Sequence, residues 1–255
     1  MDPNFWLFAA VGFAAQLVDG ALGMAFGVIS TSVLLSFGVS PANASAVVHG
    51  AKVFTGAASG ASHIFYKNVD WRLLALLAGG GVLGGTLGAY VLTSVPGEAV
   101  KPYVVGWLGL MGLIILYRAW RQTRPKVFSW RSPFPLGLVG GFFDAIGGGG
   151  WGPVVTSSLM GIGADPRKAI GTTNTAEMFV AIATSAAFLV ALLTGHWDTE
   201  GLSGLAWQLG GLIAGGVVAA PMAGWMTKVL PLRMLTWFVG VLVVGLAIWQ
   251  GVGLF

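Results

Sequence analysis

The chain contains no cysteine, which excludes disulfides, thiolate metal sites and thiol catalysis and leaves the redox compartment open. Charge is also scarce: 9% of the 255 residues are charged, against roughly 25% in a soluble globular protein. So few charges cannot cover a surface that faces water. The composition therefore excludes a soluble domain.

Apolar residues are abundant instead, at 56% of the chain, and several apolar stretches reach the roughly 20 residues that a helix needs to cross a bilayer. The 41 glycines show no triplet period and lie inside these stretches, where close packing of membrane helices tolerates them. The first four residues carry Asp2 and no Lys or Arg, so the N-terminus lacks the basic region of a signal peptide. The sequence predicts an all-α integral membrane protein with several crossings.

The net charge of +4 does not indicate a nucleic-acid partner. The basic residues lie between the hydrophobic stretches, where Lys and Arg act as signals of membrane topology. The expected partners are the lipid bilayer and a small solute, and the sequence leaves the oligomeric state open.

Two parts of the chain align without a gap when the sequence is shifted by 125 residues, the separation of Asp19 and Asp144. The aligned pairs that biased composition does not readily produce are Asp19 with Asp144, Thr31-Ser32 with Thr156-Ser157, and Pro41 with Pro166. The sequence therefore predicts an internal duplication. Residues 1–120 form the first repeat, 121–133 a basic cytoplasmic linker, and 134–255 the second repeat.

Each half shows the same series of two short apolar pieces, separated by a polar or Gly-rich break, and three full-length helices. The short pieces span about 5–18 and 24–37 in the first half, and 134–147 and 150–162 in the second. The longer helices are expected near 42–65, 72–94 and 99–120, and near 168–194, 204–229 and 232–253. A piece of about 14 residues makes about 20 Å of helix and is too short to span a bilayer alone.

The distribution of basic residues distinguishes two topologies. A kinked span in each half gives four crossings and parallel repeats, whereas a re-entrant hairpin gives three crossings and inverted repeats. With the linker in the cytoplasm, the inverted arrangement places all 13 Lys and Arg there except Lys101, which faces out, and Lys52, which lies within the membrane. The parallel arrangement moves four basic residues outside: Arg167, Lys168, Lys228 and Arg233. The positive-inside rule therefore favours inverted repeats, each a broken or re-entrant helix hairpin plus three transmembrane helices.

The breaks are the candidate substrate site. Backbone groups left unpaired in mid-membrane must line a cavity or a ligand, and short, Gly-interrupted segments in corresponding positions point to a transporter site. The second piece of each pair begins near Met24 or Gly150, and its first N–H groups carry the positive end of the helix dipole, which favours an anion. The substrate contacts predicted at the breaks are Gly23, Met24, Gly148, Gly149, Gly150, Trp151 and Gly152. In the alternative interpretation, the glycines only permit tight packing.

The helix after each break carries a polar stripe. His49 and Lys52 in the first half align with Asn174 and Glu177 in the second. Ionisable groups at membrane depth are costly and mark a pathway, so His49, Lys52 and Asn174 are predicted to contact an anion. Glu177 either carries a coupling proton or neutralises Lys52, and the alternative is a buried Lys52–Glu177 pair that serves packing alone.

Asp19 and Asp144 lie at the two breaks. An anion site tolerates them only if they cap helix N-termini or are protonated, and capping is the favoured interpretation. They are grouped with Glu177 as proton-coupling or structural residues. His49 and His63 are too few and too poorly placed for a metal site, so neither a metal nor a cofactor is expected. No zinc motif or Ser/His/Asp set indicates an enzyme.

The glycine-rich segment 143–153, followed by Thr156-Ser157 and the Ala164-Asp165-Pro166 turn, resembles the TauE/SafE sulfite-exporter family. The likeness covers nearly the whole chain, although the first-half copy is degenerate: Leu22, Met24 and Val28 replace Gly147, Gly149 and Pro153. The resemblance implies a secondary transporter that exports a small sulfur-containing anion, sulfite or an organosulfonate, across a prokaryotic inner membrane. An anion channel and an importer of similar oxyanions are the alternatives, and a cation carrier is possible if all three acidic residues face the cavity ionised.

Overall fold

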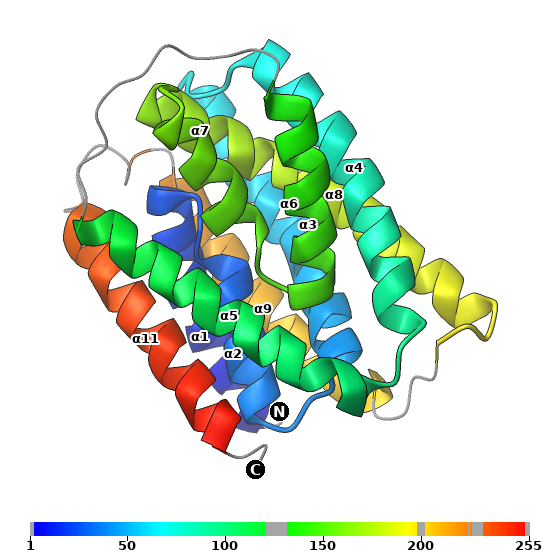
Figure 1. Ribbon diagram of the computed structural model, residues 1–255. Helices are drawn as coiled ribbons and strands as arrows, with labels where there is room; N and C mark the ends of the chain where they lie inside the picture. The colour runs from blue at the N-terminus through cyan, green and yellow to red at the C-terminus, as the bar shows by residue number, and fades with distance from the viewer. Residues whose placement is uncertain (1–2, 121–131, 198–201, 224, 226–231, 253–255) are drawn as a thin grey trace.

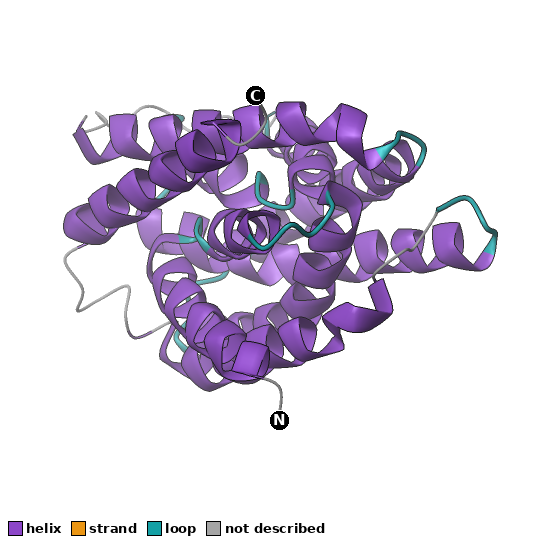
Figure 2. Ribbon diagram, turned by 90° about the horizontal axis from the view of Figure 1, so that it is seen from below, coloured by secondary structure: helices purple, strands orange, loops and turns teal. Residues whose placement is uncertain are grey.

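The structure is a computed structural model that describes residues 3–120, 132–197, 202–223, 225 and 232–252. Every regular element in these ranges is a helix, as Figure 2 shows, which confirms the all-α prediction. Four of the described helices are long and apolar enough to cross a membrane: Asn4–Leu22, Trp71–Thr93, Gly97–Trp120 and Pro166–Leu193. The predicted basic linker, 121–133, lies almost entirely outside the described residues.

Two of the first-half helices begin where the local sequence caps them. The helices of this half are α1 (Pro3–Leu22), α2 (Phe26–Ser36), α3 (Pro41–Phe65), α4 (Trp71–Thr93) and α5 (Gly97–Trp120). Pro41 occupies the first turn of α3, where its missing N–H loses no partner. The Asp70 carboxylate accepts hydrogen bonds from the Arg72 and Leu73 N–H groups, each at 3.0 Å, and so caps α4. The three full-length helices predicted for this half lie within two residues of the observed bounds.

The second half follows the same order in more pieces. They are α6 (Pro133–Gly147), η1 (Gly152–Thr156), α7 (Ser157–Gly161), α8 (Pro166–Leu193), η2 (Leu202–Leu205), α9 (Ala206–Ala219), η3 (Ala220–Met222) and α11 (Leu232–Val252). The helix predicted over 204–229 is divided into η2, α9 and η3 in its described part. The Asp165 side chain caps α8 by accepting from the Lys168 N–H at 3.0 Å.

The breaks are shorter than predicted. The helix α1 has 20 residues instead of about 14 and is long enough to cross a membrane, so the expectation of two equally short pieces is wrong for the first half. Asp19 remains helical because its carboxylate reaches forward to the next helix instead of interrupting its own. The helices end at Gly23 and Gly148, whose φ angles of +67° and +63° favour glycine. We call α1–α2 the first hairpin and α6–η1–α7 the second hairpin.

Helices of one half pack against helices of the other half. The helix α4 packs on α6 with Gly80 against the Phe134 carbonyl, and α9 packs on α1 with Gly215 against the Ala9 carbonyl. The helices α5 and α11 lie side by side and run in opposite directions (Figure 1), and Arg233 Nε at the start of α11 donates to the Ala119 carbonyl near the end of α5 at 3.0 Å.

The helices α3 and α8 are also antiparallel neighbours. Gly60 near the end of α3 lies against Thr175 near the start of α8, and Gly56 lies against Met178. Earlier in α3, the His49 ring is 6.4 Å from the Phe188 ring, between centroids. This pair of helices crosses the centre of the molecule and carries the polar stripes predicted from the sequence.

Candidate functional site

The tips of the two hairpins lie against each other. Thr31 Oγ1 of the first hairpin donates to the Gly148 carbonyl at 2.8 Å, and Thr156 Oγ1 of the second donates to the Gly23 carbonyl at 2.7 Å. Thr31 aligns with Thr156 and Gly23 aligns with Gly148, so the two bonds correspond to each other under the predicted repeat. The sequence alignment contained both threonines but assigned them no role.

Glycine is required where the two backbones touch. An added Cβ at Gly27 would lie 2.7 Å from the Gly148 carbonyl oxygen, and one at Gly149 would lie 2.5 Å from the Val28 amide nitrogen. Real Cβ atoms do not approach other atoms so closely, so both glycines serve tight packing. Tight packing at these two glycines is thus observed, while contact between them and a substrate stays a prediction.

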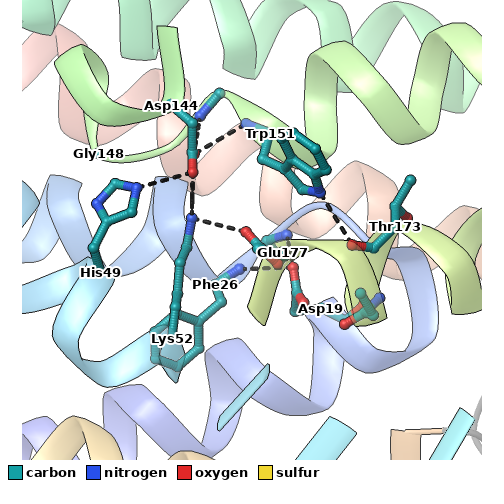
Figure 3. A network of polar contacts seen from close by, with 12 residues as sticks. Asp19, Phe26, His49, Lys52, Asp144, Gly148, Trp151, Thr173 and Glu177 are labelled. Atoms are coloured by element: carbon teal, nitrogen blue, oxygen red, sulfur yellow. Dashed lines mark hydrogen bonds and ion pairs between the residues drawn. The ribbon is translucent and has the colours of Figure 1, made fainter. Parts of the chain in front are cut away.

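Two buried carboxylates occupy corresponding positions at the hairpin tips. Asp19 Oδ1 and Asp144 Oδ1 each accept from two N–H groups at the start of the next helical piece (Figure 3). The distances are 2.7 Å to Ala25, 3.1 Å to Phe26, 2.7 Å to Gly150 and 3.0 Å to Trp151. These contacts confirm the capping prediction for both residues. The next N–H groups, at Gly27 and Gly152, have no acceptor among the described residues.

Lys52 connects two carboxylates from other helices. Its Nζ lies 3.1 and 3.0 Å from the two oxygens of Asp144 and 2.8 Å from Glu177 Oε1 (Figure 3). His49 Nε2 lies 3.1 Å from Asp144 Oδ2, and its Nδ1 lies 2.9 Å from the Ser45 carbonyl oxygen. The predicted Lys52–Glu177 pair exists. The sequence did not predict that Asp144 would bind both Lys52 and His49, because 92 and 95 residues separate these partners.

Two predicted substrate residues also make contacts that hold helices together. The Trp151 indole is fully buried and donates from Nε1 to the Thr173 carbonyl at 3.1 Å. Asn174 accepts from Ser59 Oγ at 3.1 Å and donates to the Ile170 carbonyl at 3.2 Å. These contacts fix the second hairpin and α3 against α8.

A small cavity of about 10 Å³, close to the space that one water molecule needs, lies between the tips. Eight of the thirteen predicted site residues line it: Asp19, Met24, Lys52, Asp144, Gly149, Gly150, Gly152 and Glu177. The other five do not: Gly23, His49, Gly148, Trp151 and Asn174. Four lining residues were not predicted, namely Ala25, Gly27, Val28 and Pro153. The sequence could have predicted Gly27 as a lining residue, because Gly27 aligns with Gly152 in the predicted repeat.

The charges at the cavity do not balance. Three carboxylates and the Lys52 ammonium line it, which gives −3 + 1 = −2 when all four are ionised. All four residues are buried, with exposed fractions of 8% or less. The lining of the cavity therefore carries an excess of negative charge.

These features are those of a membrane transport protein: helices of membrane length surround a buried polar centre built from two interrupted helices. The sequence profile described as sulfite exporter TauE/SafE matches residues 8–249, and the chain belongs to this family. A similar protein is "Probable membrane transporter protein YtnM" of Bacillus subtilis (strain 168), 45% identical over 229 residues that cover 87% of this chain and 74% of that protein. No solved structure matches the chain. The resemblance drawn from the glycine-rich segment is thus confirmed, and a transport role fits the expectation that the chain is not an enzyme.

Proposed function

We propose that this protein is a secondary transporter that exports a small sulfur-containing anion, sulfite or an organosulfonate, across the inner membrane of a prokaryotic cell. One observation carries the proposal: the N-terminal ends of α2 and η1 meet the Lys52 ammonium at one buried cavity. Helix N-termini and an ammonium both favour an anion, and the family is named for sulfite export.

The anion would bind the donors that the aspartate caps leave free. These are the N–H groups of Gly27 and Gly152, and Lys52 Nζ would join them once one of its two carboxylate partners moves away. Gly27 and Lys52 are immediate neighbours, because an added Cβ at Gly27 would lie 2.8 Å from Lys52 Nζ. A sulfonate or sulfite oxygen near Gly27 would therefore contact both a backbone N–H and the ammonium.

The closed cavity supports a transporter with alternating access over an open channel. A space for one water molecule cannot hold a sulfur oxyanion, so the hairpins must separate to admit one. The antiparallel α3–α8 and α5–α11 pairs and the exchanged hairpin contacts are those expected of inverted repeats, in which one half rocks against the other. A channel using the same path would need a continuous opening.

The first test is ligand binding by the purified protein in detergent, measured as a thermal shift. Sulfite, sulfate, thiosulfate and methanesulfonate are compared with chloride and a panel of cations. We expect one or more sulfur oxyanions to raise the melting temperature. Stabilisation by a cation alone contradicts the proposal and moves the assignment to Asp19, Asp144 and Glu177 as cation ligands.

A variant that keeps the formal charge of the site tests whether the anion binds at Lys52. Lys52→Ala alone would leave three buried carboxylates without a cation, so we pair Lys52→Met with Glu177→Gln, which keeps the formal charge of the site at −2. The double variant should fold and lose the anion response. Lys101→Met is the matched control, because Lys101 lines a different cavity. A normal anion response in the double variant removes Lys52 from the site.

A further inference from the structure

All three N–H donors of Lys52 are engaged in the closed structure. Two face the oxygens of Asp144 and one faces Glu177 Oε1, at 3.1, 3.0 and 2.8 Å. An anion can therefore bind Lys52 only if one of these carboxylates gives way.

Glu177 is the carboxylate that is held less firmly. Asp144 accepts from Lys52 at both oxygens, is within hydrogen-bond distance of His49, and caps the second hairpin through the Gly150 and Trp151 N–H groups. Among the described residues, the Glu177 carboxylate has one polar partner, the Lys52 ammonium. Displacing Glu177 breaks one contact, whereas displacing Asp144 also uncaps a helix.

A displaced Glu177 carboxylate would face mainly negative groups. The titratable groups around it are Lys52 and His49 on α3, Asp19 on α1 and Asp144 on α6, and the lining residues of α2 and η1 add none. With an anion on Lys52, none of these described groups supplies a free cation to compensate Glu177. A buried carboxylate in that position is much more stable in its neutral, protonated form.

We infer that the anion crosses together with a proton, which Glu177 accepts when the anion replaces it on Lys52. The inference rests on the proposed function and adds the coupled ion to it. A proton from the water of the compartment that supplies the anion binds a Glu177 carboxylate oxygen, and no bond in the anion changes. On the other side the anion leaves, Glu177 releases its proton to water, and the Lys52–Glu177 ion pair forms again.

This coupling determines which gradients drive net transport of the anion. One proton moves with each anion, so the crossing of a monoanion carries no net charge. The anion gradient and the pH gradient then decide the direction of net flux, and the membrane potential has no effect on a monoanion. The same coupling can run inward or outward.

The test uses proteoliposomes of the full chain with a pH-sensitive dye in the lumen and the potential clamped by potassium and valinomycin. Methanesulfonate and thiosulfate are the probes, because neither titrates near neutral pH and lumenal pH changes then report the protein. We expect anion exit to make the lumen alkaline, with one proton for each anion. The affinity for the anion should fall about tenfold per pH unit once Glu177 deprotonates in the free protein.

Two variants, each replacing a glutamate by glutamine, complete the experiment. Glu177→Gln should bind the anion with an affinity independent of pH and should lose the lumenal pH change. Glu98→Gln, an exposed residue at the start of α5, should behave as the wild type. If Glu177→Gln does not fold, the proton-to-anion ratio and the pH dependence of the wild type still decide.

The outcomes separate the inference from the proposed function. Anion flux in the wild type without a pH change, or proton movement that persists in Glu177→Gln, overturns the inference and leaves the transporter intact. Absence of flux above that of protein-free vesicles for sulfite, thiosulfate and methanesulfonate overturns the proposed function, and the inference with it.

Discussion

The two hairpin tips have the same backbone design and different charges. Asp19 and Asp144 each cap the next helical piece, and the two N–H groups that each one accepts from lie at aligned positions. Asp144 also binds Lys52 and His49, whereas Asp19 has no ion pair among the described residues and lies at the cavity with Glu177. The two tips therefore share the capping geometry and differ in their charged contacts.

Each tip also has partners from the other half of the chain. His49 and Lys52 of α3 serve the second hairpin, while Asn174 of α8 lies near the first, with its Nδ2 3.5 Å from the Asp19 carbonyl oxygen. Movement of either half would therefore change the surroundings of both tips. Substitutions at paired positions show how far the two tips differ.

The largest difference is expected between Asp144→Ala and Asp19→Ala. Asp144→Ala removes a cap and leaves the buried Lys52 with one carboxylate, which should lower the free energy of unfolding by about 3–5 kcal/mol. Asp19→Ala removes a cap alone and should cost about 1 kcal/mol. Denaturant unfolding in detergent measures both values. Equal losses would mean that the charge cluster adds nothing to stability.

A smaller difference is expected between Gly148→Ala and Gly23→Ala. Both positions have positive φ, so each substitution should cost about 1–2 kcal/mol through backbone strain. The new methyl at residue 148 would also collide with Thr31, whereas at residue 23 it would lie 3.1 Å from the nearest atom, Thr156 Cγ2. Gly148→Ala should therefore unfold at the lower temperature in a thermal scan. The reverse order would contradict the close approach at the second tip.

The smallest difference is expected between the two threonines that join the hairpins. Thr31→Val and Thr156→Val each remove a hydrogen bond to a carbonyl of the facing tip, at about 1–2 kcal/mol. Thr156 lies 2.8 Å from Thr173 Oγ1 as well, so its substitution should cost slightly more. A matched pair of unfolding curves measures the difference, and no loss in either variant would show that the tips are held by packing alone.

Much of the fold follows from local sequence. The full-length helices were predictable because apolar runs of membrane length are bounded by caps such as Asp70 and Asp165, which act within three residues of themselves. The end of α1 was not predictable, because an Asp-Gly pair is typical of a break. The Asp19 carboxylate instead satisfies N–H groups six and seven residues ahead and leaves its own helix intact.

By itself the sequence determined the membrane class, predicted an internal duplication and marked the charged residues within the apolar stretches, because composition and register are properties of the chain alone. Only the tertiary structure decided that Asp144 binds both Lys52 and His49, that Trp151 and Asn174 support helices, and that the tips close around space for one water molecule. The contacts of Asp144 with Lys52 and His49 join residues that lie 92 and 95 positions apart in the chain. Helix packing brings such residues together, and no local pattern in the sequence records their partners.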